Sequence, residues 1–115
     1  MRYWSVAEAR DYLPRLRELI TAVREAVAVA TRSQNNGHGG AKSSIGPAEA
    51  LEELAKGDIE LRDAERGLVD FHALGADGVV YLLCWQLGED DLAWWHLPEE
   101  GFAGRKRLPR NESGS

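Results

Sequence analysis

Hydrophobic positions in the first third of the chain repeat with the period of an α-helix, on one stripe. Ser5 followed by Glu8 is typical of a capping box at the start of a helix. Pro14 lacks an amide donor and disfavours helical geometry in the residue before it. The pattern therefore predicts a short helix over 6–12, a kink or break, and a long helix over 14–33. The stripe of the long helix includes Leu16, Leu19, Ile20 and Val23.

A polar segment rich in glycine follows at 34–46, and we expect it to be a flexible linker. Pro47 then opens a second helix at a position where its missing donor costs nothing. Gly57 is predicted to end that helix in the left-handed conformation. The two helices are expected to form an antiparallel hairpin over 6–57.

After the second helix the hydrophobic period changes to two, which is typical of strands. Asp77-Gly78 is a strong hairpin turn signal. We expect one α+β domain over 1–115, in which the helical hairpin packs on a three- or four-stranded antiparallel sheet. The segment 98–115 is predicted to be irregular. The predicted strands lie at 59–62, 68–72, 79–87 and 92–97. The predicted core contains Leu16, Leu19, Ile20, Val23, Leu51, Leu54, Phe71, Val80 and Leu82.

Composition and charge narrow the classes of function. The 115 residues suffice for one domain, and the formal net charge of -5 argues against binding to duplex nucleic acid. No apolar run approaches the roughly 20 residues of a membrane span, and the N-terminus carries no secretory pattern. The single cysteine, Cys84, rules out an intrachain disulfide. The expected location is the cytoplasm.

Three polar side chains on consecutive predicted strands have the atoms of a transition-metal site. Asp70 offers a carboxylate, Cys84 a thiolate and His96 an imidazole, a set that suits a divalent ion such as zinc. His72 or Glu89 would supply a fourth ligand. The alternative is a structural network in which Cys84 is a small core residue. We do not expect Cys84 to act as a catalytic nucleophile, because a thiol in the middle of a strand is poorly placed for attack.

Hairpin parity decides between these two interpretations, because alternate side chains point to opposite faces of a sheet. An even number of unpaired residues in the turn after the Cys84 strand pairs Trp85 with Trp94 and Cys84 with Trp95. His96 then lies on the face opposite Cys84, which favours plain core packing. An odd number, or a bulge, puts Cys84 across from His96, as the metal site requires.

The sheet also carries an unusual density of tryptophan, which two helices cannot cover completely. An exposed aromatic face on a small domain is typical of an interface, and self-association is the expected default. We expect Arg105 to bind the carboxylate of Asp70 or Glu89 and so hold the C-terminal segment over this face. The tryptophans in question are Trp85, Trp94 and Trp95.

Three stretches of the chain resemble a known bacterial family, the domain of unknown function 2203. This resemblance implies a shared fold and a bacterial origin, but no activity. The chain departs from the family pattern at His72, where Pro is usual, and the glycine-rich linker resembles a local expansion. The matching stretches are Trp4-Ser5-Val6-Ala7-Glu8-Ala9 through Leu13-Pro14; Gly67-Leu68-Val69-Asp70-Phe71; and Leu83-Cys84-Trp85-Gln86-Leu87-Gly88-Glu89, followed by Trp95-His96, Gly101-Phe102 and Arg105.

Two functions remain open from sequence alone. The first is a non-enzymatic interaction protein that associates with itself through the tryptophan-rich sheet or through the alanine-rich end of the first long helix. The alternative is a small metal-binding protein that uses Asp70, Cys84 and His96. The identity of a partner or small ligand does not follow from the residues.

Overall fold

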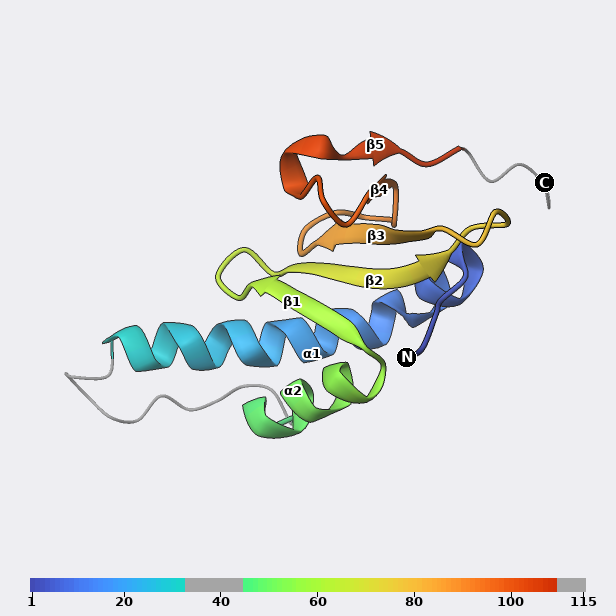
Figure 1. Cartoon of the computed structure of the whole chain (residues 1–115). Coiled ribbons are helices and arrows are strands. Elements are labelled where there is room, and N and C mark those ends of the chain that lie inside the picture. Colours follow the sequence, from blue (N-terminus) through green and yellow to red (C-terminus); the bar gives the residue numbers. More distant parts are fainter. Residues whose placement is uncertain (33–44, 110–115) are drawn as a thin grey trace.

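The computed structural model describes residues 1–32 and 45–109, arranged as two helices packed on one sheet (Figure 1). Most of the predicted linker at 34–46 lies outside the described residues. The elements are α1 (Val6–Arg32), α2 (Pro47–Lys56), β1 (Ile59–Asp63), β2 (Leu68–Leu74), β3 (Val80–Gln86), β4 (Trp94–His96), the 3-10 helix η1 (Phe102–Gly104) and β5 (Lys106–Arg107).

The sheet has five strands in the order β1-β2-β3-β4-β5, rather than the predicted three or four, and every neighbouring pair is antiparallel. The α+β class and the hairpin at Asp77-Gly78 are confirmed, and Gly78 adopts the positive φ of 82° that such turns need. The prediction that everything after 97 is irregular was wrong. Strand β5 pairs with β4 and Leu108 N–H donates to Ala93 O at 2.7 Å, because the open edge of β4 offers unpaired backbone groups.

Helix α1 begins at the predicted capping box. Ser5 N–H donates to the Glu8 carboxylate at 3.0 Å, and Glu8 N–H donates to Ser5 Oγ at 3.0 Å. Pro14 does not end the helix, although the first turns tilt away from the axis of the remainder (Figure 1). Leu13 and Leu16 are buried on either side of the proline, so tertiary packing holds the helix together across the missing hydrogen bond.

Helices α1 and α2 are joined by a polar clamp on Glu53. The Glu53 carboxylate accepts from Tyr12 Oη at 2.6 Å and from Arg15 Nη2 at 2.7 Å. Gly57 ends α2 with a φ of -90°, so the predicted left-handed cap was misplaced by one residue. Asp58 takes the positive φ of 55°, and its carboxylate accepts from Arg2 N–H at 2.6 Å.

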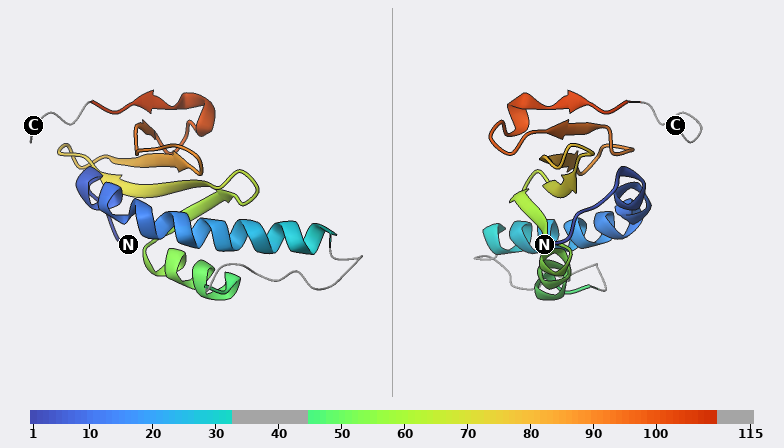
Figure 2. Two further views of the ribbon diagram at one scale, coloured as in Figure 1. Left: turned by 180° about the vertical axis from the view of Figure 1, so that it is seen from behind. Right: turned by 45° about the vertical axis from the view of Figure 1, so that its right-hand side comes forward.

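The main core lies between α1 and one face of the sheet, as the view from behind shows (Figure 2). Two residues that were predicted to lie in the core are not buried. Leu51 is 46% exposed, because α2 turns Ala50 and Leu54 inward instead, and Val80 is only half-buried beside the β2–β3 turn. The predicted residues that are buried are Leu16, Leu19, Ile20, Val23, Leu54, Phe71 and Leu82.

Trp4 ties the N-terminal segment to both layers. Its backbone N–H donates to His72 O at 2.8 Å, and its indole Nε1–H donates to Gly57 O at 2.9 Å. Its ring packs against Tyr12 and Phe71, with ring centroids 5.1 and 5.0 Å away. The amphipathic indole thus meets the core with its rings and the backbone with its one donor. No helix in the described part of the chain is long and apolar enough to cross a membrane.

The C-terminal segment folds back beside the sheet face that α1 does not cover, and Arg105 holds it there. Arg105 Nη2 lies 2.9 and 3.0 Å from the two carboxylate oxygens of Glu89, so Glu89 rather than Asp70 is its acidic partner. The guanidinium also stacks over Phe102 and Trp94, 4.6 and 4.9 Å from the ring centroids. One arginine therefore joins β4, η1 and the turn after β3.

We expect Arg105→Ala to destabilise the fold by about 1–3 kcal/mol, because Glu89 then keeps only its bond from Gln86 N–H. The side chains of Arg105 and Glu89 are 12% and 27% exposed, so solvent does not replace the lost partner fully. The measurement is the urea denaturation midpoint. Arg107→Ala is the matched control, since Arg107 is exposed and contacts the Trp94 ring in the same segment. Equal midpoints for wild type and Arg105→Ala would contradict the role of this pair.

Candidate functional site

The register of three strands brings the predicted site residues to one face. Asp70 on β2 pairs directly with Cys84 on β3. Cys84 in turn pairs with Trp94, and His96 on β4 pairs with Leu82. This is the odd parity, so Cys84 and His96 share the face away from α1, two positions apart. The Trp85–Trp94 pairing of the even case does not form.

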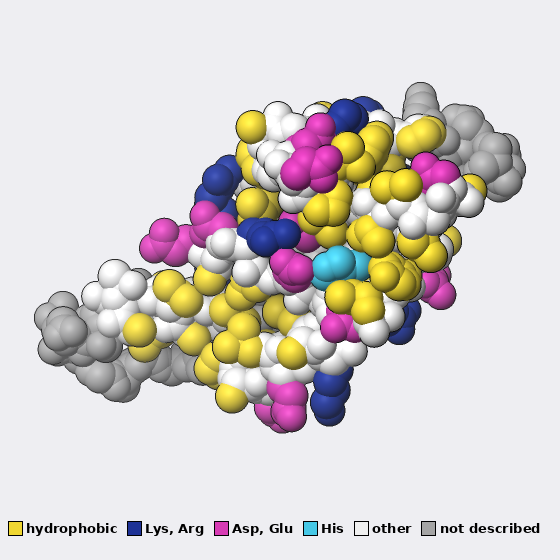
Figure 3. Space-filling model, in the orientation of Figure 1, with side chains coloured by type: hydrophobic (Ala, Val, Ile, Leu, Met, Phe, Trp, Pro, Cys, Tyr) yellow, Lys and Arg dark blue, Asp and Glu magenta, His cyan; other side chains and the backbone are white. Residues whose placement is uncertain are grey.

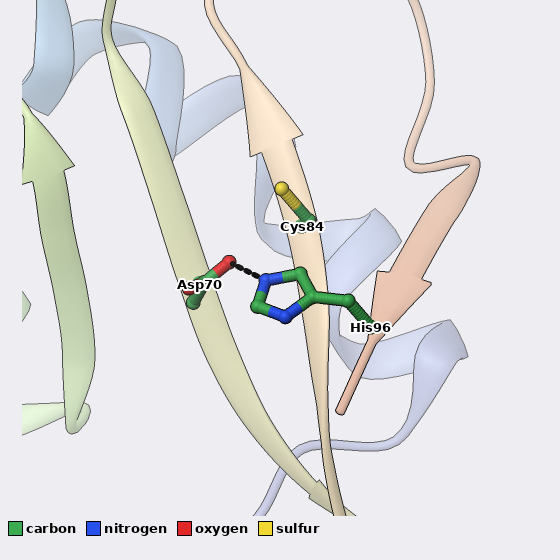
Figure 4. Close-up of side chains that lie close together, drawn as sticks. All are labelled: Asp70, Cys84 and His96. Atoms are coloured by element: carbon green, nitrogen blue, oxygen red, sulfur yellow. Dashed lines mark hydrogen bonds and ion pairs between the residues drawn. The ribbon is translucent and has the colours of Figure 1, made fainter. Parts of the chain in front are cut away.

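Asp70, Cys84 and His96 form a compact buried group, hereafter the Asp–Cys–His cluster. Each residue comes from a different strand, and their ligand atoms all lie within 4.8 Å of one another (Figure 4). The three residues are only 2%, 1% and 2% exposed, respectively. A carboxylate, a thiol and an imidazole therefore converge in an environment from which water is largely excluded.

The His96 ring faces an oxygen acceptor at each nitrogen. Nδ1 lies 2.8 Å from Leu97 O, and Nε2 lies 3.1 Å from Asp70 Oδ1. A carbonyl oxygen only accepts, so Nδ1 carries a proton. Nε2 then faces the Asp70 carboxyl group and is the ring nitrogen left for a metal ion or a further hydrogen bond. A backbone carbonyl that fixes Nδ1–H and leaves Nε2 for a cation is the usual support of a metal-binding histidine.

The Cys84 thiol is held in its protonated form. Burial, with a further contribution from the negative charge of Asp70, raises the pKa of Cys84 to about 12. A thiol with this pKa is a poor nucleophile at neutral pH. A metal ion would displace the thiol proton, because only the thiolate binds metal well.

The buried charge of Asp70 is met by a residue that sequence reasoning missed. Arg62 Nε on β1 donates to Asp70 Oδ2 at 2.7 Å, and Arg62 Nη2 lies 3.0 Å from Glu60. The pairing of β1 with β2 would have been the signal, because Glu60 lies opposite Asp70 and Arg62 follows at the β-bulge between Leu61 and Asp63, from which its side chain reaches Asp70. Arg62 thus supports Asp70 from the rim of the cluster.

A pocket of about 210 Å³ opens beside the cluster. Figure 3 shows one face of the molecule in the orientation of Figure 1. Hydrophobic side chains dominate this face, with a few charged side chains and a histidine among them. All three residues of the cluster contribute to the lining of this pocket. Its lining residues are Arg62, Leu68, Asp70, Cys84, His96, Pro98, Gly101 and Phe102.

The two residues proposed as a fourth ligand, His72 and Glu89, bind other partners in the structure. His72 Nε2 pairs with Glu60 at 3.0 Å and its Nδ1 lies 2.9 Å from Asp58 O. Glu89 binds Arg105 and the backbone of Gln86. Among the residues that the structure describes, neither His72 nor Glu89 joins the Asp–Cys–His cluster.

The three tryptophans do not form one exposed binding face. Trp85 is fully buried against the helical layer, where the Arg17 guanidinium lies 5.8 Å from its ring centroid, so it does not belong to an exposed aromatic face. Trp94 and Trp95 are half-buried and point to opposite faces, as adjacent strand residues must. Trp95 packs edge-on against Tyr81, with ring centroids 5.8 Å apart.

Comparison with known proteins supports the resemblance seen in the sequence. A family described as an uncharacterized conserved protein, DUF2203, matches residues 2–108. No curated protein and no solved structure matches the chain. Because the match spans nearly all of its residues, the chain belongs to the DUF2203 family.

Proposed function

We propose that this protein binds a divalent transition-metal ion, such as zinc, at the Asp–Cys–His cluster. The observation that carries the proposal is the convergence of three different ligand types, from three strands, within 4.8 Å. The Nδ1 contact to Leu97 O adds to it, since this contact orients His96 with Nε2 toward the other two ligands.

The chemistry of the three donors favours a borderline ion over a hard one. Oxygen-rich sites suit magnesium and calcium, whereas thiolate and imidazole ligands suit zinc and its neighbours. Charge balance points the same way. A divalent cation with the Cys84 thiolate, the Asp70 carboxylate and a neutral His96 forms a group without net charge, which is the least costly state for a buried site.

We expect the untagged protein to bind one equivalent of zinc, and to show a sulfur-to-metal charge-transfer band when loaded with cobalt. Cys84→Ser is expected to abolish the band and to weaken zinc by more than the roughly 10–100-fold typical of losing an outer partner. The measurements are elemental analysis, competition with a chromophoric chelator, and absorption spectroscopy. His72→Gln is the control, because His72 lies on the same face outside the cluster. Equal zinc affinity in wild type and Cys84→Ser would refute the site.

We expect metal affinity to rise with pH. The Cys84 pKa of about 12 keeps the thiol protonated across the neutral range, so each metal ion bound must release that proton. The apparent association constant should then increase about tenfold per pH unit from this group alone. Calorimetry at one pH in two buffers of different ionisation enthalpy counts the protons released. A proton count of zero would show that the thiolate is not a ligand.

A second proposal is self-association, and one observation favours it. An apolar groove of about 580 Å³ lies near the β2–β3 turn, where Val79 is 52% exposed. Apolar surface of this kind is typical of contact with another protein, here a second copy of the chain. The groove is lined by Gly75, Ala76, Asp77, Val79, Tyr81, Trp95, Leu97, Leu108 and Pro109.

We expect Val79→Asp to shift the protein from dimer to monomer in sedimentation equilibrium, because a buried unpaired charge opposes the contact. Leu51→Asp is the control, since Leu51 is similarly exposed but lies on α2. A wild-type protein that stays monomeric at the highest concentration measured would end this proposal.

A further inference from the structure

The Asp–Cys–His cluster supplies three ligands, one fewer than a closed zinc site uses. Structural zinc sites bind four protein ligands, whereas sites that exchange a ligand keep three and leave one position to a small molecule. In the described part of the chain, the group of converging ligand atoms has three members. The other candidates, His72 and Glu89, are held by Glu60 and Arg105.

The pocket beside the cluster is placed to supply the missing ligand. All three cluster residues contribute to its lining, and its other walls include Leu68, Pro98 and Phe102. Its volume of about 210 Å³ is small beside the roughly 300–1,000 Å³ of sites for drug-sized ligands. The space therefore suits a ligand of a few heavy atoms.

The charges around the pocket select the kind of ligand. A divalent ion with Asp70 and the Cys84 thiolate has no net charge, so the Arg62 guanidinium remains as positive charge on the described lining. Glu60 pairs with Arg62 outside the described pocket lining, where the two side chains are 42% and 43% exposed and solvent screens both charges. A guanidinium has five N–H donors, more than its contacts to Asp70 and Glu60 require.

We infer that the bound metal keeps an open coordination position in this pocket, and that this position takes a small anion with a carboxylate or similar oxyanion group. The anion binds the metal through one oxygen and Arg62 through its charge. This inference rests on the proposed metal binding and adds the ligand class. The rival interpretation is that Arg62 serves only to neutralise Asp70, in which case the open position has no preference for anions.

The experiment uses the full chain loaded with cobalt and two probes, acetate as the anion and imidazole as a neutral ligand. We expect each probe to change the visible cobalt spectrum in a saturable way. Arg62→Gln should weaken acetate on the order of tenfold and leave imidazole within about twofold, because only the anion depends on the guanidinium charge. Arg62→Lys, which retains the charge, should recover part of the acetate affinity.

A matched control is Arg66→Gln, because Arg66 stacks on Phe102, 4.9 Å from the ring centroid, without lining the pocket. Its acetate affinity should equal that of the wild type. If cobalt does not bind at all, the proposed metal site fails. If cobalt binds but neither probe changes its spectrum, the open position is wrong. If Arg62→Gln weakens both probes equally, the anion preference is wrong and Arg62 only positions Asp70.

Discussion

The buried carboxylate of Asp70 is the constraint on which the outer face of the sheet depends. It sits in the middle of β2 with 2% exposure, where an unpaired charge would cost several kcal/mol. Arg62 from β1 and His96 from β4 compensate it from both sides. Removing Asp70 alone would leave Arg62 and His96 without their acidic partner, so the three side chains stand or fall together.

Alternate side chains of β2 point to opposite faces of the sheet and have different roles there. Val69, Phe71 and Ala73 point into the helical layer and anchor the strand, while Asp70 and His72 point outward. The cluster is thus mounted on three strands whose other face is a packed core, which fixes its geometry. The C-terminal segment forms the outer wall of the pocket, and the ion pair between Arg105 and Glu89 holds this segment in place. The same ion pair therefore stabilises the segment and fixes one wall of the pocket.

The sequence was sufficient for features that depend on local pattern, such as the capping box at Ser5, the turn at Asp77-Gly78 and the α+β class. It failed where long-range packing decides. Pro14 stays inside α1 because buried residues on both sides hold the helix, and Leu51 is exposed because α2 turns a different stripe inward. For the cluster, the residue types indicated Asp70, Cys84 and His96. The sequence did not determine the number of unpaired residues between β3 and β4, which decides whether Cys84 and His96 share a face. Arg62 was missed, since its partner lies on another strand.

The position of the cluster also bears on what a metal would do for the protein. The hydrophobic core lies on the opposite face of the sheet and holds the strands without any contribution from Cys84 or His96. In domains that fold only with zinc, the metal replaces such a core. Here protons occupy the thiol and His96 Nδ1 while the cluster stays buried, and a metal would replace the thiol proton with the same three residues in place. Metal binding would then change the chemistry of the pocket rather than the fold. Its main effect should therefore be a change in the affinity of the pocket for small ligands, with a smaller change in thermal stability.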